Sequence, residues 1–153
     1  MKVVDTFEYV SVLRELTEEG KSVSMLIAGS SMNPFLAHQR DYIYFEKPKR
    51  PLKKGDMVFY QRRSGQFVMH RICKVRKDGL YDIVGDNQTE IETGIARDQI
   101  FALITKVKRK GKMVEPGNFW WDFFEKVWIR MIPIRPLARK VYGVIYRIKS
   151  GRT

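Results

Sequence analysis

The sequence predicts a mainly β domain of the α+β class, in which an antiparallel sheet or partly open barrel carries one N-terminal helix and two C-terminal amphipathic helices. Between residues 42 and 108, short runs rich in β-branched and aromatic residues alternate with glycine-containing turns. No helical pattern separates these runs, which favours antiparallel pairing over units of strand, helix and strand. Helical periodicity is found only towards the two ends of the chain.

The first 20 residues predict a helix followed by a short strand. Asp5 and Glu8 have the spacing of a capping-box variant, and the apolar residues that follow recur three and four positions apart. Gly20 supplies a helix stop. Residues 22–28 are apolar and strand-like, and they end abruptly in a turn that is rich in glycine and serine.

The centre of the chain predicts five further strands. They cover residues 42–46, 57–62, 67–75, 80–84 and 101–108. Glycine, aspartate, asparagine and serine occupy the intervening positions, where turns need them. No repeat or low-complexity segment interrupts this pattern.

The composition changes at residues 115–117, which predicts a domain of residues 1–117 and an amphipathic, aromatic and basic tail of residues 118–153. Two helices are expected in the tail, broken at Pro133 and Pro136. Eight basic and two acidic residues give the tail a net charge of +6.

The tail combines aromatic and basic side chains, as helices that lie in a membrane interface do. We expect it to bind an anionic membrane surface without spanning the bilayer, through Trp120, Trp121, Trp128, Arg139 and Lys140. In the alternative interpretation, the tail folds back and buries its aromatic residues against the β domain.

Charge and cysteine content restrict the partners and the chemistry. The chain has 29 Lys and Arg against 17 Asp and Glu, and this net charge of +12 predicts an anionic neighbour. The single cysteine, Cys73, excludes an internal disulfide, and no Cys/His cluster offers four zinc ligands. We therefore expect no metal and no organic cofactor. Neither a secretory signal nor an apolar run of about 18 residues is found, so a cytoplasmic location at the periphery of a membrane is expected.

Ser31 is the candidate nucleophile. Gly29 lies two residues before it and Pro34 three residues after it, so Ser31 is expected on a rigid corner with its own amide exposed. A nucleophilic serine needs such access, and the exposed amide can donate to an oxyanion. Turns without any catalytic role have the same composition, so a simple turn is the alternative.

His70 is the candidate base. Alternation along the strand at residues 67–75 places His70 on the apolar face, while Arg71 and Cys73 point the other way. An imidazole has an unperturbed pKa of about 6.5, which suits proton transfer from a serine near neutral pH. The alternative is a histidine that is hydrogen-bonded in the core. His38 lies in a polar stretch and is expected at the surface.

Four acidic residues follow the strand at residues 80–84, namely Asp86, Glu90, Glu92 and Asp98. One of them could orient the imidazole and stabilise its charged form, as the third member of a triad does. In the alternative interpretation, Asp86 only helps to form a turn.

Four short motifs occur in an order that resembles the signal peptidase I family, which shares a superfamily with the self-cleaving SOS-response repressors. The motifs are Gly29-Ser30-Ser31-Met32-Asn33-Pro34-Phe35-Leu36, Lys54-Gly55-Asp56-Met57-Val58, Met69-His70-Arg71-Ile72 and Gly85-Asp86-Asn87. The resemblance covers residues 22–109. It implies a signal-peptidase-like, mostly β fold in which a serine attacks a peptide carbonyl.

The resemblance also implies roles for individual residues. Ser31 matches the serine of the family's Ser-Met-x-Pro motif. His70 before Arg71 is similar to the archaeal and endoplasmic-reticulum branch, in which histidine replaces the lysine base of the bacterial enzymes. That branch has an aspartate shortly after its Gly-Asp-Asn motif. This chain has Glu92 at the corresponding spacing, which leaves the third member open between Glu92 and Asp86.

Two features depart from the family. Many relatives have a serine at the position of Gly29 that helps to form the oxyanion hole, so the hole here is expected to consist of the Ser31 amide and Ser30. The family's membrane-spanning N-terminal anchor has no counterpart in the sequence, and the tail beyond residue 117 is expected to replace it.

These observations predict a serine endopeptidase, a signal peptidase-like hydrolase that cleaves signal- or leader-type peptides at the membrane surface. A Ser/His mechanism with an acyl-enzyme intermediate is expected, with a peptide or preprotein as substrate and an anionic membrane surface as partner. One alternative is a non-catalytic peptidase-fold module that binds peptide or membrane. The other is a basic nucleic-acid-binding protein, although no motif that reads nucleic acid accompanies the basic runs.

Overall fold

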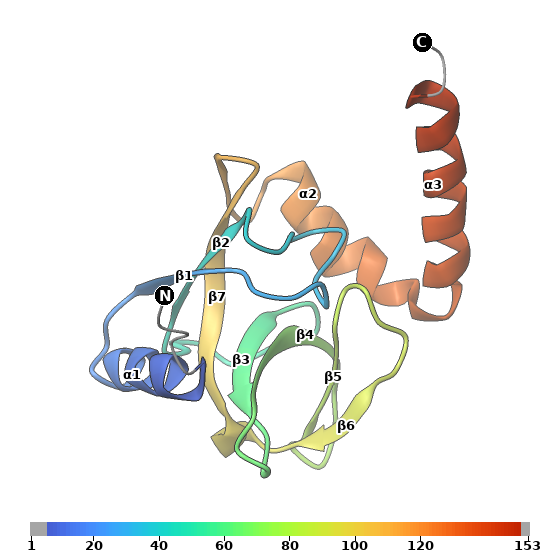
Figure 1. Cartoon of the computed structure of the whole chain (residues 1–153). Coiled ribbons are helices and arrows are strands. Elements are labelled where there is room, and N and C mark those ends of the chain that lie inside the picture. The colour runs from blue at the N-terminus through green and yellow to red at the C-terminus, as the bar shows by residue number, and fades with distance from the viewer. Residues whose placement is uncertain (1–5, 151–153) are drawn as a thin grey trace.

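A computed structural model of the chain describes residues 6–150 (Figure 1). Within that range, some side chains lie outside the description, namely those of residues 6, 7, 139, 142, 143 and 146–150. The expected capping residue Asp5 therefore lies outside the described residues. The same is true of the side chain of Arg139, one of the expected membrane-binding residues.

An antiparallel sheet of eight strands forms the centre of the molecule. Its strands are β1 (Val23–Leu26), β2 (Tyr42–Glu46), β3 (Met57–Gln61), β4 (Phe67–Val75), β5 (Tyr81–Val84), β6 (Glu92–Ile95), β7 (Ile100–Arg109) and β8 (Lys112–Val114). Seven are paired in the order β1-β2-β7-β3-β4-β5-β6, and β8 pairs with β7. The ends of this order do not pair in the described part of the chain, so the sheet is not a closed barrel.

The predicted α+β class is confirmed in its main features, because an antiparallel sheet lies between one N-terminal helix and several C-terminal helical segments. All six expected strands are present. The sequence reasoning missed β6 and β8. β6 contains Gly94 and begins with a charged residue, and β8 has only three residues, so neither shows the alternation that identifies a strand.

Helix α1 (Thr6–Glu18) packs on β1 and β7 at one side of the sheet (Figure 1). Its apolar face buries Val10 and Leu13 in the core. The helix is followed by Gly20, whose φ of +85° lies in the left-handed region where glycine is favoured. The predicted helix and its stop are therefore confirmed.

The core has two parts. One cluster combines side chains of α1, β1, β2, β3, β7, the loop after β1 and the segment after residue 118. The other lies between β3, β4, β5, β6 and β7, and includes Tyr60, Ile72 and Ile83. Strands β3 and β4 are therefore covered on both faces, and His70 and Arg71 are both buried.

Residues 119–134 form a chain of short helical segments that folds back on the sheet. They are α2 (Phe119–Asp122), the π-helical η2 (Phe123–Val127) and the 3-10 helices η3 (Trp128–Arg130) and η4 (Ile132–Ile134). Trp121, Phe124 and Trp128 are buried in the first core cluster. This part of the expected tail therefore packs against the β domain, as the alternative interpretation of a tail that folds back has it.

The buried positions also correct the expected membrane-binding residues. Trp121 is 7% exposed and Trp128 is 5% exposed, so neither is available to a membrane. Trp120 is 46% exposed, and Lys140 is exposed on the last helix. That helix, α3 (Arg135–Ser150), projects away from the body (Figure 1).

Candidate active site

Ser31 lies in the loop after β1, and both sides of this loop are fixed. On the C-terminal side, Met32 and Leu36 are buried in the first core cluster, and the N–H of Leu36 donates to the carbonyl of Met32 (2.9 Å). On the N-terminal side, Gly29 has a φ of +89°, which a residue with a side chain rarely adopts. The rigid corner that was expected at Ser31 is therefore present.

His38 contacts this loop, which the sequence reasoning did not anticipate. Its side chain is exposed, as predicted, but Nδ1 accepts the backbone N–H of Gly29 at 2.7 Å. This hydrogen bond to His38 helps to hold the backbone two residues before Ser31.

The backbone carbonyl and the backbone N–H of Ser31 differ in their hydrogen bonding. The carbonyl accepts the N–H of Asn87 at 2.8 Å. The amides of Ser30 and Ser31, in contrast, donate to no acceptor among the described residues. These two N–H groups are available to a ligand, as an oxyanion hole requires.

The loop at residues 85–88 approaches Ser31 so closely that it leaves no room for a side chain at Gly85. A Cβ atom at Gly85 would lie 2.6 Å from the carbonyl oxygen of Ser31 and 2.9 Å from Oε1 of Gln88. The glycine of the Gly85-Asp86-Asn87 motif therefore allows the two loops to pack together.

The loop at residues 85–88 is held in turn by two buried arginines. Arg135, the first residue of α3, donates through Nη1 to the carbonyls of Gly85 and Gln88, each at 2.9 Å. Arg71 pairs with the Asp86 carboxylate from β4, at 2.9 Å and 3.0 Å. The Ser31 corner thus rests on a loop that β4 and the start of α3 both support.

His70 and Ser31 line the same groove, with a volume of about 330 Å³. The groove lies between β1 with the loop after it and β4, and Gly29, Met69 and Gln88 also line it. No hydrogen bond joins the Ser31 hydroxyl to the imidazole in the described structure. Such contacts are often loose without substrate, so the shared groove is the relevant observation.

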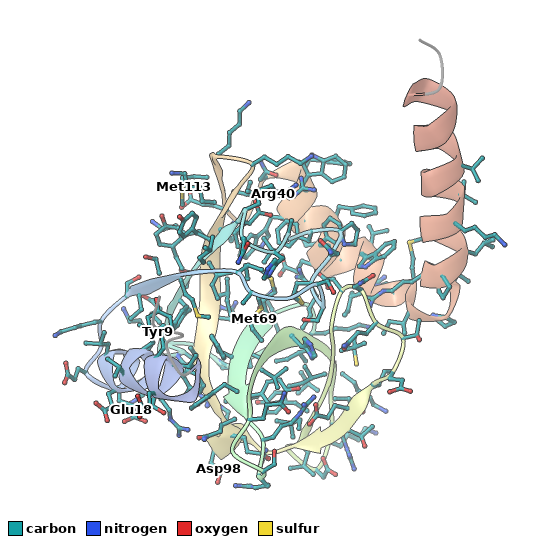
Figure 2. The ribbon with its side chains drawn as sticks, viewed as in Figure 1. Tyr9, Glu18, Arg40, Met69, Asp98 and Met113 are labelled. Carbon is teal, nitrogen blue, oxygen red and sulfur yellow. The ribbon has the colours of Figure 1, made fainter. Side chains whose placement is uncertain are left out.

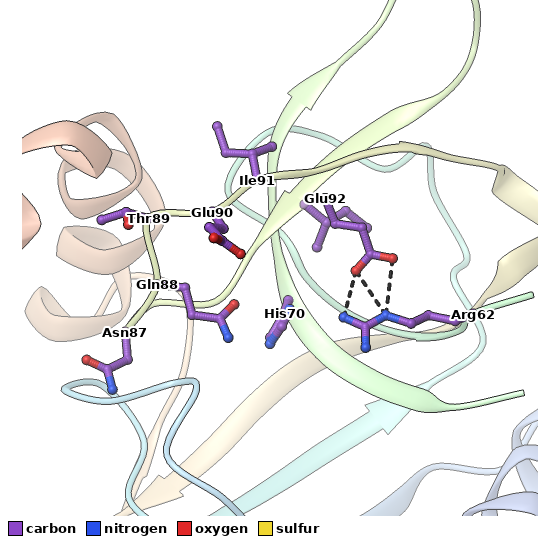
Figure 3. A pocket seen from close by; sticks show the side chains of 9 residues that line it. Arg62, His70, Asn87, Gln88, Thr89, Glu90, Ile91 and Glu92 are labelled. Atoms are coloured by element: carbon purple, nitrogen blue, oxygen red, sulfur yellow. Dashed lines mark hydrogen bonds and ion pairs between the residues drawn. The ribbon is translucent and has the colours of Figure 1, made fainter. Parts of the chain in front are cut away.

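A second, larger pocket of about 670 Å³ is also lined by His70 (Figure 3). Its lining includes Arg62, Gln88, Glu90 and Glu92. Figure 3 shows His70 between Gln88 on one side and the Arg62–Glu92 pair on the other. Arg62, His70 and Gln88 line both this pocket and the groove that contains Ser31.

The surroundings of His70 keep its imidazole neutral. The side chain is 6% exposed, and its ring lies 6.4 Å from that of Tyr60. Burial and the positive charge of Arg62 lower the pKa of His70 to about 4, and Glu92 opposes part of this shift. A neutral imidazole can accept a proton from a serine, so burial does not disqualify His70 as a base.

Glu92 is close enough to His70 to influence it by charge, but it does not bond to it. Its carboxylate accepts from Nη2 of Arg62 (2.8 Å) and from the hydroxyl of Tyr60 (2.7 Å). The pKa of Glu92 lies below its usual range, because these hydrogen bonds outweigh the effect of burial. Burial and Glu92 together raise the pKa of the Tyr60 hydroxyl.

The carboxylate of Asp86 pairs with Arg71 and not with His70. Both of its carboxylate oxygens bond to Arg71, whose exposed fraction is 1%, and its carbonyl accepts Nε1–H of Trp128 at 2.8 Å. Strand alternation does direct Arg71 away from His70, but that side is also buried, which the sequence pattern did not indicate. The geometry therefore assigns Asp86 a structural ion pair, and the interpretation of Asp86 as the acid next to His70 is not supported.

The other two acidic residues differ in position. Glu90 is exposed and lines the pocket in Figure 3, with its carboxylate on the side of His70. Asp98 pairs with Arg63 at the surface, and Figure 2 places it at the end of the body away from Met69. Asp98 is therefore outside the candidate site.

Several residues of the site were missed from the sequence. Arg62 ends the strand that was predicted at residues 57–62, and nothing in the pattern indicated that it would lie beside His70. Gln88 lines both cavities. Arg135 was counted only as one of the tail's basic residues, although it is fully buried. A buried arginine leaves no periodic signal, because its partners are carbonyl groups far away in the chain.

Comparisons of the chain with protein-family models, with curated proteins and with solved structures find no match. Within residues 6–150, no group of three or more His, Cys, Asp or Glu side chains is placed to hold a metal ion. None of the described helices is long and apolar enough to cross a membrane. The functional interpretation therefore rests on the geometry around Ser31 and His70.

Replacing Gly85 with alanine is expected to lower any activity that depends on Ser31 by about tenfold to a hundredfold. The new methyl group collides with the Ser31 carbonyl, and displacing a reacting group by about 1 Å can cost two orders of magnitude. Gly79→Ala is the control for a collision: its φ of +85° strains an alanine within its own turn, but the open space around it leaves nothing for the methyl group to displace. Full activity of Gly85→Ala would show that the contact between the two loops does not position Ser31.

Proposed function

We propose that the protein is a serine endopeptidase that cleaves leader- or signal-type peptides. The observation that carries the proposal is the shared groove, which is lined both by Ser31, on a fixed corner, and by a buried imidazole that is neutral near pH 7. The backbone amides of Ser30 and Ser31, which donate to no acceptor among residues 6–150, would supply the hydrogen bonds that an oxyanion needs. The motif resemblance to the signal peptidase I family agrees with this reading.

In the proposed reaction, Oγ of Ser31 attacks the carbonyl carbon of the scissile bond while His70 takes the hydroxyl proton. The amides of Ser30 and Ser31 stabilise the negative oxygen that forms. His70 then gives its proton to the leaving amine as the C–N bond breaks, which leaves an ester on Ser31. Water, deprotonated by His70, hydrolyses this ester and restores the serine.

The groove also supports an extended, apolar substrate. Among the described strands, β1 pairs with β2 alone, and a peptide could add a strand at its other edge. Next to this edge, the groove is lined by apolar side chains that include Met25, Phe59 and Met69. A peptide bound along β1 would place one apolar side chain in the groove beside Ser31. This selects peptides with a small or medium apolar residue before the cut.

Glu92 completes the proposed site through charge rather than through a hydrogen bond to the base. It neutralises Arg62, whose positive charge would otherwise oppose protonation of His70 during the reaction. The site therefore works as a Ser31–His70 dyad with a paired carboxylate nearby, and Asp86 supports the fold.

One specific observation favours a second candidate function, a peptide-binding module without turnover. His70 bonds neither to Ser31 nor to a carboxylate among the described residues. Such a module would bind peptides in the same groove, and Ser31→Ala would leave its affinity unchanged. Cleavage products therefore discriminate between the two candidates.

The proposal is tested by incubating the purified protein with leader peptides that vary in the residue before the cut, and by following products by mass spectrometry. The rate should rise with pH through about 4 and stay level from roughly pH 5 to 8, because the base acts as neutral imidazole and its pKa is lowered to about 4. This replaces the rise through pH 6 to 7 that an unperturbed histidine would give.

His70→Ala should remove the activity at every pH. His38→Ala should cost much less, since it removes only the hydrogen bond to Gly29. A rate that rises through about pH 6.5 would indicate a different base, and equal losses in the two variants would contradict the assignment of His70. The folded fraction must be followed in parallel. The pKa of His70 is about 4 in the folded protein and about 6.5 in the unfolded chain. Between these pH values the unfolded chain takes up a proton at His70 that the folded protein does not, so the free energy of unfolding falls as the pH falls.

A further inference from the structure

Helix α3 leaves the body with its apolar face uncovered. Leu137, Val141, Val144 and Ile145 lie on one side of the helix, at the spacing i, i+4, i+7 and i+8. Their exposed fractions are 63%, 51%, 47% and 49%. Figure 1 shows the helix directed away from the sheet, and the contacts that hold it to the body are made near its start, by Arg135 and Ala138. Something outside the described fold must cover this face for it to be stable in water.

The charge of this region indicates what covers it. Residues 126–153 contain eight Lys and Arg and no Asp or Glu. Lys140 is exposed on α3, directly before Val141 of the apolar stripe. A second copy of the chain would bring another basic helix against the first, and like charges would repel. An anionic lipid surface offers both an apolar layer and the opposite charge.

We propose that α3 lies in the interface of an anionic bilayer, with Leu137, Val141, Val144 and Ile145 directed into the acyl boundary. This surface differs from the one expected from the sequence, because Trp121 and Trp128 belong to the core. It consists of α3 alone, and it does not depend on whether Ser31 acts as a nucleophile.

The test is flotation of the full chain with vesicles of phosphatidylcholine, with and without phosphatidylglycerol. The wild-type protein should float with the anionic vesicles, and added salt should weaken binding, because each basic residue near the surface contributes about fivefold in affinity. Val141→Glu combined with Ile145→Glu should reduce the bound fraction at least tenfold.

Val75→Glu combined with Met113→Glu is the matched control. These side chains are 44% and 45% exposed, belong to β4 and β8, and introduce the same two charges (Figure 2 labels Met113). This control should float like the wild type, and so should Ser31→Ala, which separates the lipid site from the proposed peptidase. Circular dichroism of all variants checks that they are folded.

Three results would overturn the proposal. The wild-type protein could remain at the bottom of the gradient with anionic vesicles, or the α3 double variant could float as well as the control. In the third, the wild type forms a dimer in sedimentation velocity without lipid, the α3 variant is monomeric, and neither floats. That outcome would assign the apolar face to a second copy.

Discussion

Replacing Ser31 with alanine is expected to lower the rate of peptide cleavage by a factor on the order of a thousand or more. The substitution removes the proposed attacking oxygen and nothing else, since the contacts that fix the corner come from the backbone of Ser31 and from Met32 and Leu36. The thermal midpoint should therefore stay close to that of the wild type. Ser64→Ala, at an exposed position in the turn between β3 and β4, is the matched control.

The rate is best measured together with labelling by a serine-reactive fluorophosphonate. Labelling of the wild type and of Ser64→Ala, but not of Ser31→Ala, would assign the reactive hydroxyl directly. Because some serine peptidases with unusual bases resist such probes, product formation decides. Unchanged product formation by Ser31→Ala would rule out the proposed nucleophile.

Asp86→Asn is expected to destabilise the fold by about 3 to 5 kcal/mol, the usual cost of removing one partner from a buried ion pair. It leaves the Arg71 guanidinium, which is almost fully buried, without its counter-charge. Glu92→Gln is the informative comparison, because the Arg62–Glu92 pair is about one third exposed and its loss should cost far less stability. Urea unfolding of the three proteins measures both effects.

These two variants also distinguish the acids by function. Glu92→Gln should lower the pH at which the cleavage rate rises, because Glu92 is the group that raises the pKa of His70. Asp86→Asn should act on stability first. An Asp86→Asn protein that keeps the wild-type stability and loses only cleavage would return Asp86 to the role of catalytic acid.

The candidate site could be found from the sequence where local pattern determines the structure. Gly29 and Pro34 bracket Ser31 within six residues, and the alternation along β4 places His70 on a face opposite to Arg71. What the sequence could not give was the environment of these residues. The low pKa of His70 depends on burial and on Arg62, which approaches from another strand.

For the tail, too, the sequence pattern does not determine which apolar residues are buried. The aromatic segment after residue 118 has a wide apolar face, and a lipid interface and a protein core select the same residue types for such a face. Only the tertiary structure distinguishes Trp121 and Trp128, which are buried, from the apolar side chains of α3, which are exposed. The sequence pattern alone therefore does not distinguish a fold-back of residues 119–134 from a membrane-bound segment.

The hydrogen bonds of Arg135 to the carbonyls of Gly85 and Gln88 connect the start of α3 to the loop at residues 85–88. That loop in turn bonds to Ser31 through the N–H of Asn87. Helix α3 has 16 residues and is about 24 Å long. A change in its direction at Arg135 would therefore strain the hydrogen bonds to Gly85 and Gln88. If α3 lies flat on a bilayer and Ser31 is the nucleophile, as proposed, the groove would be held at one height above the lipid. In a substrate anchored in the same membrane, we would then expect cleavage only at the peptide bond that lies at this height.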